Sequence, residues 1–151
     1  MKQSVDEVFY GREEEHSRFT ELYRSAGLEV GDNWTETSHP IISFTARRNG
    51  LLLGAATVSN RFGRQVLDYL AVIPESRGTG IGRRLTEMCL DFARERGETK
   101  LWIAAKKPGY YRKLGAHETE DTVLLSDCRR CPEYRRSCDP EELVFHMKET
   151  P

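Results

Sequence analysis

The sequence has 151 residues, 31% of them charged, and a formal net charge of -1 at pH 7. This length suits one domain, residues 1–151, with a single hydrophobic core, and the balanced charge argues against nucleic acid or an anionic membrane as a partner. No apolar run could span a membrane and no signal peptide is evident, so we expect a cytoplasmic protein. A monomer and a homodimer both remain open.

The N-terminal part predicts a strand, a helix and a polar loop. Val5–Tyr10 has the composition of a short strand, and Glu13–Ala26 has the periodicity of a helix. Leu28–Pro40 is rich in turn residues but includes Trp34 and His39, so it is a candidate binding loop. Packing of Trp34 on the core and a surface position for His39 are the simpler alternatives.

The next segment predicts consecutive antiparallel strands. Ile41–Arg48 and Leu51–Val58 flank Asn49-Gly50, the strongest two-residue signal for a hairpin turn. Gly54 indicates a bulge or a close approach of two backbones. Asn60–Arg64 predicts the turn into a third strand.

In the stretch Val66–Gly97, which begins with that third strand, the hydrophobic period changes from about two to about 3.6 residues. Val66–Ile73 reads as a strand that Pro74 ends, and Ile81–Gly97 as an amphipathic helix that Gly97 terminates. The order of elements is that of a strand feeding directly into a helix.

The turn between them reads Arg77-Gly78-Thr79-Gly80-Ile81-Gly82. Alternate glycines let backbone N–H groups approach an anion, and a helix N-terminus adds partial positive charge. Arg77 and Arg83 could add charge-assisted contacts to a pyrophosphate. The Lys-Ser/Thr of a nucleoside triphosphate loop is absent, and Arg83 stands where a dinucleotide fingerprint requires glycine. We therefore expect a phosphorylated cofactor of another kind.

The C-terminal part predicts two strands and a short helix beyond a parallel strand. Lys100–Ala105 follows the long helix, so it should lie parallel to Val66–Ile73 through a right-handed crossover. Pro108–Gly115 predicts a short helix, and His117–Asp127 and Glu142–Lys148 predict the last strands. The order β, α, three β, α, β, α, two β indicates a mixed α/β domain.

At this point the sequence resembles the GNAT superfamily of acyl-CoA N-acetyltransferases. The first signature is matched by Val72, Pro74, Arg77, Gly80 and Gly82, and Gly109–Gly115 resembles the second. The resemblance implies a mostly antiparallel central sheet with helices on both faces and a splay between two parallel strands. It also implies acetyl-CoA as cosubstrate, bound by the main chain of the first parallel strand and by the glycine-rich turn: Leu70, Ala71, Val72, Arg77, Gly78, Thr79, Gly80, Ile81, Gly82 and Arg83.

The resemblance further implies that Tyr111 protonates the leaving sulfur of CoA, with Tyr110 as the rival if the alignment shifts by one residue. For the base that deprotonates the amine, Asp68 is the first candidate. His39, Glu36 and His117 follow it. The sequence departs from the family at Ala104–Lys107, where an asparagine is usual, and at Ala116, where an aromatic residue is usual.

Three cysteines, Cys128, Cys131 and Cys138, form a cluster in the loop before the last strand. A Cys-x-x-Cys pair with a third thiolate could bind a structural zinc ion. A redox-sensitive disulfide and reduced thiols are the alternatives. The candidates for a fourth ligand are His146, His117, Asp127, Asp139 and water.

We therefore expect an N-acetyltransferase that moves an acetyl group from acetyl-CoA to a primary amine of a small molecule or amino acid. The cysteine-containing tail is similar to that of some bacterial amino-acid (glutamate-type) N-acetyltransferases. One alternative is a non-catalytic CoA-binding or thiol-responsive sensor module. Another is an RNA or protein contact through four arginines, although such charge is usually a solvated face: Arg129, Arg130, Arg135 and Arg136.

Overall fold

The computed structural model describes residues 7–14, 19–26, 38–125, 129, 135–136 and 138–147. Its strands are β1 (Phe9–Glu13), β2 (Ser38–Arg48), β3 (Leu51–Arg61), β4 (Arg64–Val72), β5 (Lys100–Ala105), β6 (His117–Glu118) and β7 (Glu141–His146). Its helices are α1 (Thr20–Ser25), the one-turn 3₁₀ helix η2 (Pro74–Ser76), α3 (Ile81–Glu95) and α4 (Pro108–Lys113). Among these helices, none is long and apolar enough to cross a membrane.

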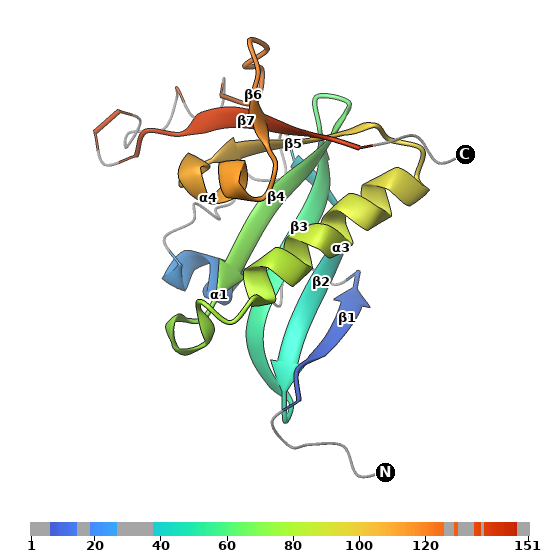
Figure 1. Ribbon diagram of the computed structural model, residues 1–151, viewed down its shortest axis with the longest axis vertical. Coiled ribbons are helices and arrows are strands. Elements are labelled where there is room, and N and C mark those ends of the chain that lie inside the picture. Colours follow the sequence, from blue (N-terminus) through green and yellow to red (C-terminus); the bar gives the residue numbers. More distant parts are fainter. Residues whose placement is uncertain are drawn as a thin grey trace.

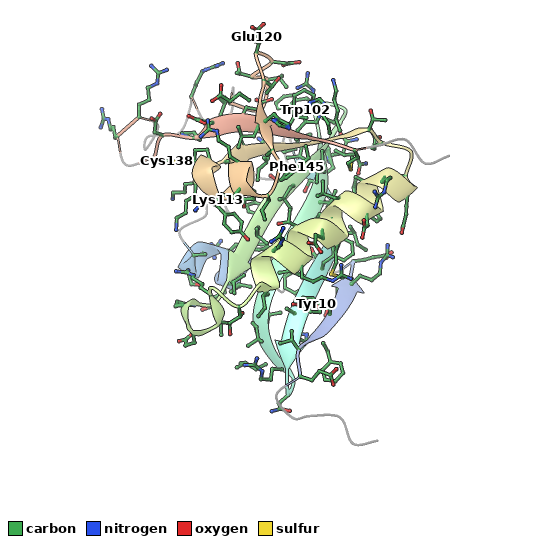
Figure 2. All side chains as sticks on the ribbon, viewed as in Figure 1. Tyr10, Trp102, Lys113, Glu120, Cys138 and Phe145 are labelled. Carbon is green, nitrogen blue, oxygen red and sulfur yellow. The ribbon has the colours of Figure 1, made fainter. Side chains whose placement is uncertain are left out.

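The strands form one sheet in the order β1-β2-β3-β4-β5-β7-β6, in which only β4 and β5 pair in parallel. The long helix α3 lies across one face (Figure 1), where Leu85 shares the main core with Val58. On the opposite face, Phe19 and Tyr23 of α1 pack against Tyr69 of β4. The mixed, mostly antiparallel sheet with helices on both faces is therefore confirmed. Side chains fill the space between α3 and the sheet (Figure 2).

The long helix begins and ends at glycines. Gly80 is its N-cap residue, with φ +89° in the left-handed region that L side chains avoid. At the other end Gly97 has φ +84°, its N–H donates to Arg94 O at 2.9 Å, and the Glu98 N–H donates to Ala93 O at 3.0 Å. This pair of bonds is a Schellman motif, which satisfies carbonyl groups that the last turn would otherwise leave unpaired.

Both expected hairpin turns are present. Asn49 and Gly50 have φ +50° and +77° and connect β2 to β3, as the Asn-Gly sequence predicts. Phe62 and Gly63, with φ +54° and +76°, connect β3 to β4. The three strands before α3 are therefore consecutive antiparallel neighbours.

Gly54 of β3 has both of the features that a glycine within a strand indicates, a bulge and a close approach of another backbone. The pairing of β2 with β3 shifts register beside it, between Ala46 and Arg47. A Cβ atom added at Gly54 would lie 2.9 Å from Ala71 O and 3.3 Å from side-chain atoms of Ile81 and Leu85. The absence of a side chain therefore lets α3 approach the sheet closely.

We expect Gly54→Ala to lower the free energy of unfolding by about 1–3 kcal/mol, because backbone and core atoms must move to admit the methyl group. Thermal or urea unfolding measures this change. Gly109→Ala is the matched control, since a Cβ there meets nothing within 4 Å and no unusual φ is required. Equal stability of the two variants would contradict the close packing at Gly54.

The central strand β4 has an irregularity where it approaches β5. Thr57 pairs with Tyr69 and Val58 with Leu67, so Asp68 is an extra residue in β4, a β-bulge. Between β4 and β5 the parallel pairing is limited to Val66 and Trp102. Beyond that pair the strands diverge, and the expected splay is confirmed.

Two predicted elements at the N-terminus have different limits. Glu13, expected to start the first helix, instead ends β1, where it pairs with Ser43 and forms an ion pair with Arg47 at 3.2 Å. Cross-strand pairing there outweighs the helical pattern, and in the described residues α1 occupies only Thr20–Ser25. Among the described residues the first strand begins at Phe9, and Val5, the expected start, lies outside them.

The prediction of a strand over His117–Asp127 is wrong beyond Glu118, because the segment that follows donates hydrogen bonds to a buried carboxylate. The N–H groups of Leu124 and Leu125 donate to Glu142 Oε1 at 2.8 and 3.3 Å. Burial raises the pKa of Glu142, while these N–H donors and the nearby Arg64 oppose that rise. The chain at Leu124 and Leu125 is therefore turned onto β7 by one side chain.

Candidate active site

The glycine-rich turn joins the C-terminal end of β4 to α3. Gly78 and Gly80 have φ +77° and +89°, and Arg77 Nε donates to Val72 O at 3.1 Å. The first bond within the helix runs from the Arg84 N–H to Gly80 O at 3.0 Å, and Gly80 offers no side-chain cap. The N–H groups at the start of α3 therefore have no carbonyl partner within the helix. This is what an anion-binding helix N-terminus requires.

Charge at this turn has one sign. The first turn of α3 includes no acidic residue, and both Arg83 and Arg84 are exposed. Each of them lies 3.6 Å from the Glu87 carboxylate further along the helix, a weak surface pairing that a phosphate could displace. The turn can therefore hold a pyrophosphate through backbone N–H groups, with arginines around it.

A cavity of about 520 Å³ extends from this turn through the splay to the C-terminal end of α1. It collects residues from β4, the turn, the start of α3, β5 and α4. Of the ten residues expected to bind the cofactor, Thr79 alone does not line it; its hydroxyl donates to Ser76 O within the turn. The residues of the expected cofactor site that line the cavity are Leu70, Ala71, Val72, Arg77, Gly78, Gly80, Ile81, Gly82 and Arg83.

Two tyrosines of α4 line the same cavity. Their rings meet edge to face, with centroids 5.1 Å apart. A Cβ atom on Gly82 would lie 2.4 Å from the Tyr110 hydroxyl oxygen, so that phenol lies against the first turn of α3. Tyr111 is more buried and packs on the main core, and burial raises its pKa above the ordinary value. A phenol with a raised pKa keeps its proton at neutral pH, as a proton donor must.

Asp68, the first candidate for the base, lines the cavity from the bulge in β4. Its side chain is only 5% exposed and accepts a bond from Arg61 Nη1 at 3.3 Å. Among the alternatives, His39 on β2 and His117 on β6 are exposed and do not line the cavity. Glu36 and Trp34 lie outside the described residues.

Sequence reasoning missed part of the lining. Ile103, Ala104 and Ala105 of β5 line the cavity, and their parallel alignment with β4 could have indicated this. Lys106 and Lys107 line it too, although the sequence was interpreted there only as lacking an asparagine. Two lysines directly after a strand that runs parallel to β4 are the signal that could have revealed them.

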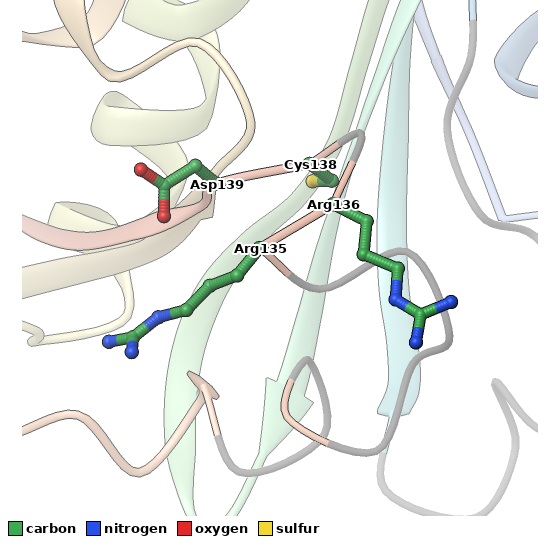
Figure 3. A pocket seen from close by; sticks show the side chains of 4 residues that line it. All are labelled: Arg135, Arg136, Cys138 and Asp139. Atoms are coloured by element: carbon green, nitrogen blue, oxygen red, sulfur yellow. The ribbon is translucent and has the colours of Figure 1, made fainter.

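The cysteine cluster cannot be assembled from the described residues, because Cys128, Cys131 and Asp127 lie outside them. Cys138 borders a hollow of about 450 Å³ with Arg135, Arg136 and Asp139, and the two arginines point in different directions (Figure 3). In the part of the chain that the structure describes, no group of three or more His, Cys, Asp or Glu side chains could hold a metal ion. Zinc stays a prediction, which elemental analysis with a thiol count under denaturing conditions tests: no zinc with four free thiols would contradict it.

Comparisons with a family model and with a related protein both identify acetyltransferases. Residues 9–116 match the sequence model of the acetyltransferase (GNAT) family. An uncharacterized N-acetyltransferase of Chlorobaculum tepidum is 27% identical over 134 residues, which cover 85% of this chain and 86% of that protein.

Solved structures share the fold. Nourseothricin acetyltransferase has a TM-score of 0.57 and 28% identity, over 71% of this chain and 65% of that one. N-acetylglutamate synthase from Neisseria gonorrhoeae, solved with coenzyme A and N-acetyl-glutamate, has a TM-score of 0.68 and 19% identity, over 95% of this chain and 36% of that one. The chain therefore spans less than two thirds of the length of either solved protein.

Proposed function

The chain belongs to the acetyltransferase (GNAT) family, and on that premise we propose that it transfers the acetyl group of acetyl-CoA to a primary amine of a small molecule or an amino acid. One observation carries the proposal: a single cavity joins an anion-binding turn, the open edge of β4, two tyrosines and a buried carboxylate. Each is a part that acyl transfer to an amine needs, and one cavity can hold both substrates in contact.

We assign the pyrophosphate of CoA to the turn and its pantetheine arm to the splay. Beyond Val66, the edge of β4 that faces β5 has no strand partner among the described residues. Successive residues of a strand direct their main-chain groups to alternate edges, so part of the N–H and C=O groups of Leu70, Ala71 and Val72 can meet the amides of an extended ligand, much as a sheet edge receives an added strand. Val72 O also accepts a bond from Arg77 Nε. Bound there, acetyl-CoA supplies a thioester carbonyl carbon that an amine can attack.

The proton transfers fall to two side chains. We assign Asp68 to accept a proton from the acceptor's ammonium group, which frees the nitrogen lone pair. As the new C–N bond forms and the C–S bond breaks, the Tyr111 phenol donates its proton to the departing sulfur, and the nitrogen loses its second proton to solvent, which leaves a neutral amide. Solvent then returns a proton to Tyr111 and removes one from Asp68, so both groups are restored.

The lining also limits the acceptor. Asp68 is the one acidic side chain among the described residues that line the cavity, and the lining also includes the apolar Leu67, Leu70 and Ile103. An acceptor with a free ammonium group and an apolar or cationic body matches this end of the cavity. The cationic residues of the lining suit the phosphates of CoA instead: Arg77, Arg83, Lys106 and Lys107.

Release of free thiol from acetyl-CoA in the presence of single amines tests the proposal. Phenethylamine, spermidine, L-lysine and L-glutamate sample apolar, cationic and acidic bodies. We expect turnover with at least one amine and its loss in Asp68→Asn. A protein that CoA stabilises but that acetylates no amine would favour the non-catalytic CoA-binding or thiol-responsive module instead.

A further inference from the structure

The bulge in β4 brings one carboxylate to the apex of the splay. Asp68 follows closely on Val66, the last residue of β4 that pairs with β5, and it lines the cavity. A bulge kinks a strand and re-aims a side chain, so Asp68 departs from the regular alternation of β4. A side chain 5% exposed at such a place needs a partner that compensates its lost hydration.

Arg61 is a hydrogen-bond partner of Asp68, but it lies outside the lining of the cavity. It is the last residue of β3, its guanidinium donates to Asp68 Oδ1 at 3.3 Å, and its side chain is 12% exposed. Arg61 does not line the cavity, whereas Asp68 does. Any effect of Arg61 on a bound amine must therefore pass through Asp68.

We propose that Arg61 is a positioning residue: its guanidinium holds the Asp68 carboxylate in the orientation from which it can receive the proton of the acceptor amine. This rests on the proposed function. A guanidinium beside a buried carboxylate favours the charged form, and its hydrogen bond fixes the carboxylate rotamer.

Other titratable groups surround Asp68 and must be distinguished from Arg61. Tyr23 approaches from α1; burial raises the pKa of its phenol, and the Asp68 charge adds to that rise. Tyr23 also donates to or accepts from Thr57 Oγ1 at 2.7 Å and stacks on Tyr69. Four more titratable groups line the same cavity from α4 and the end of β5: Tyr110, Tyr111, Lys106 and Lys107.

The test compares Arg61→Met with Arg61→Lys. In Arg61→Met we expect kcat/KM to fall about tenfold across the pH–rate profile because the carboxylate is no longer held in place, and the acid limb to move to higher pH because the cation beside the base is lost. Arg61→Lys retains a positive charge and should return the limb most of the way. The amine is whichever of the four named above the wild type acetylates.

Arg47→Met is the matched control. Arg47 forms the same kind of pair with Glu13, at 3.2 Å, but between β2 and β1 and away from the cavity. Its loss should leave the acid limb in place. A limb that moves equally in both variants, or in neither, would overturn the role of Arg61.

A second measurement separates this inference from the proposed function. The ¹³C signal of the Asp68 carboxyl, assigned by its loss in Asp68→Asn, should change its chemical shift at pH 7 in Arg61→Met and keep it in Arg61→Lys. An unchanged chemical shift in Arg61→Met would overturn the inference even in an active enzyme. A wild type that acetylates no amine would overturn the proposed function, and the base role of Asp68 with it.

Discussion

Gly80→Val is expected to abolish the stabilisation that CoA gives the wild-type protein. At a ligand concentration one hundred times its dissociation constant, that stabilisation should be about 2.7 kcal/mol, visible as a rise in Tm. Gly80 has φ +89°, and no protein atom lies within 4 Å of where its Cβ would be. This space is open, so under the proposed assignment of the turn a valine there would meet the CoA pyrophosphate, and its Cβ would also strain the N-cap of α3.

Gly63→Val separates ligand loss from strain. Gly63 has φ +76° and open space around its missing Cβ, but it lies in the β3–β4 turn and does not line the cavity. Both variants should lose stability without ligand, by about 1–2 kcal/mol from the left-handed conformation. Gly63→Val should keep the full CoA-dependent rise in Tm, and retention of that rise in Gly80→Val would contradict the assignment of the turn.

The parts of the fold that the sequence predicts well depend on local signals. Asn49-Gly50 requires positive φ at both positions, so it specifies its turn without help from the rest of the chain. The change of period in Val66–Gly97, with glycines on each side of Ile81, likewise specifies a strand, a glycine-rich turn and a helix. The order of strands and α-helices among the described residues is the one that the sequence predicts.

The parts that the sequence could not predict depend on tertiary contacts. No sequence pattern around Asp68 predicts a bulge, because the bulge arises where β4 still pairs with β3 but diverges from β5. The segment after β6 depends on Glu142 of β7, a side chain distant in sequence that accepts hydrogen bonds from the Leu124 and Leu125 N–H groups. Cross-strand pairing at Glu13 overrides a helical pattern in the same way.

In the candidate site, too, the sequence predicts what depends on local motifs and not what depends on tertiary contacts. The turn from Arg77 to Arg83 is a local motif, and its place at the cavity was predictable. Which of two adjacent tyrosines faces which part of the cavity was not, because α4 must first dock on α3. The docked helix separates them: the Tyr110 hydroxyl lies at Gly82, while Tyr111 packs on the core.

This separation gives the two phenols different expected roles. Tyr111→Phe should lower kcat by about 10² and leave the dissociation constant of CoA unchanged, because phenylalanine keeps the packed ring and removes only the proton donor. Burial raises the pKa of Tyr111, so the phenol stays protonated through its ordinary range. The wild-type rate should therefore show no decline from Tyr111 below about pH 10.

Tyr110→Phe is the matched control one residue earlier in α4. Its hydroxyl lies over the first turn of α3, beside the expected phosphate site, so its loss should raise the KM for acetyl-CoA and change kcat little. Steady-state kinetics with acetyl-CoA and the preferred amine, together with CoA titrations, measure both variants. If Tyr110→Phe stops turnover and Tyr111→Phe does not, the proton donor is the phenol at Gly82, and the alignment that assigned Tyr111 is wrong by one residue.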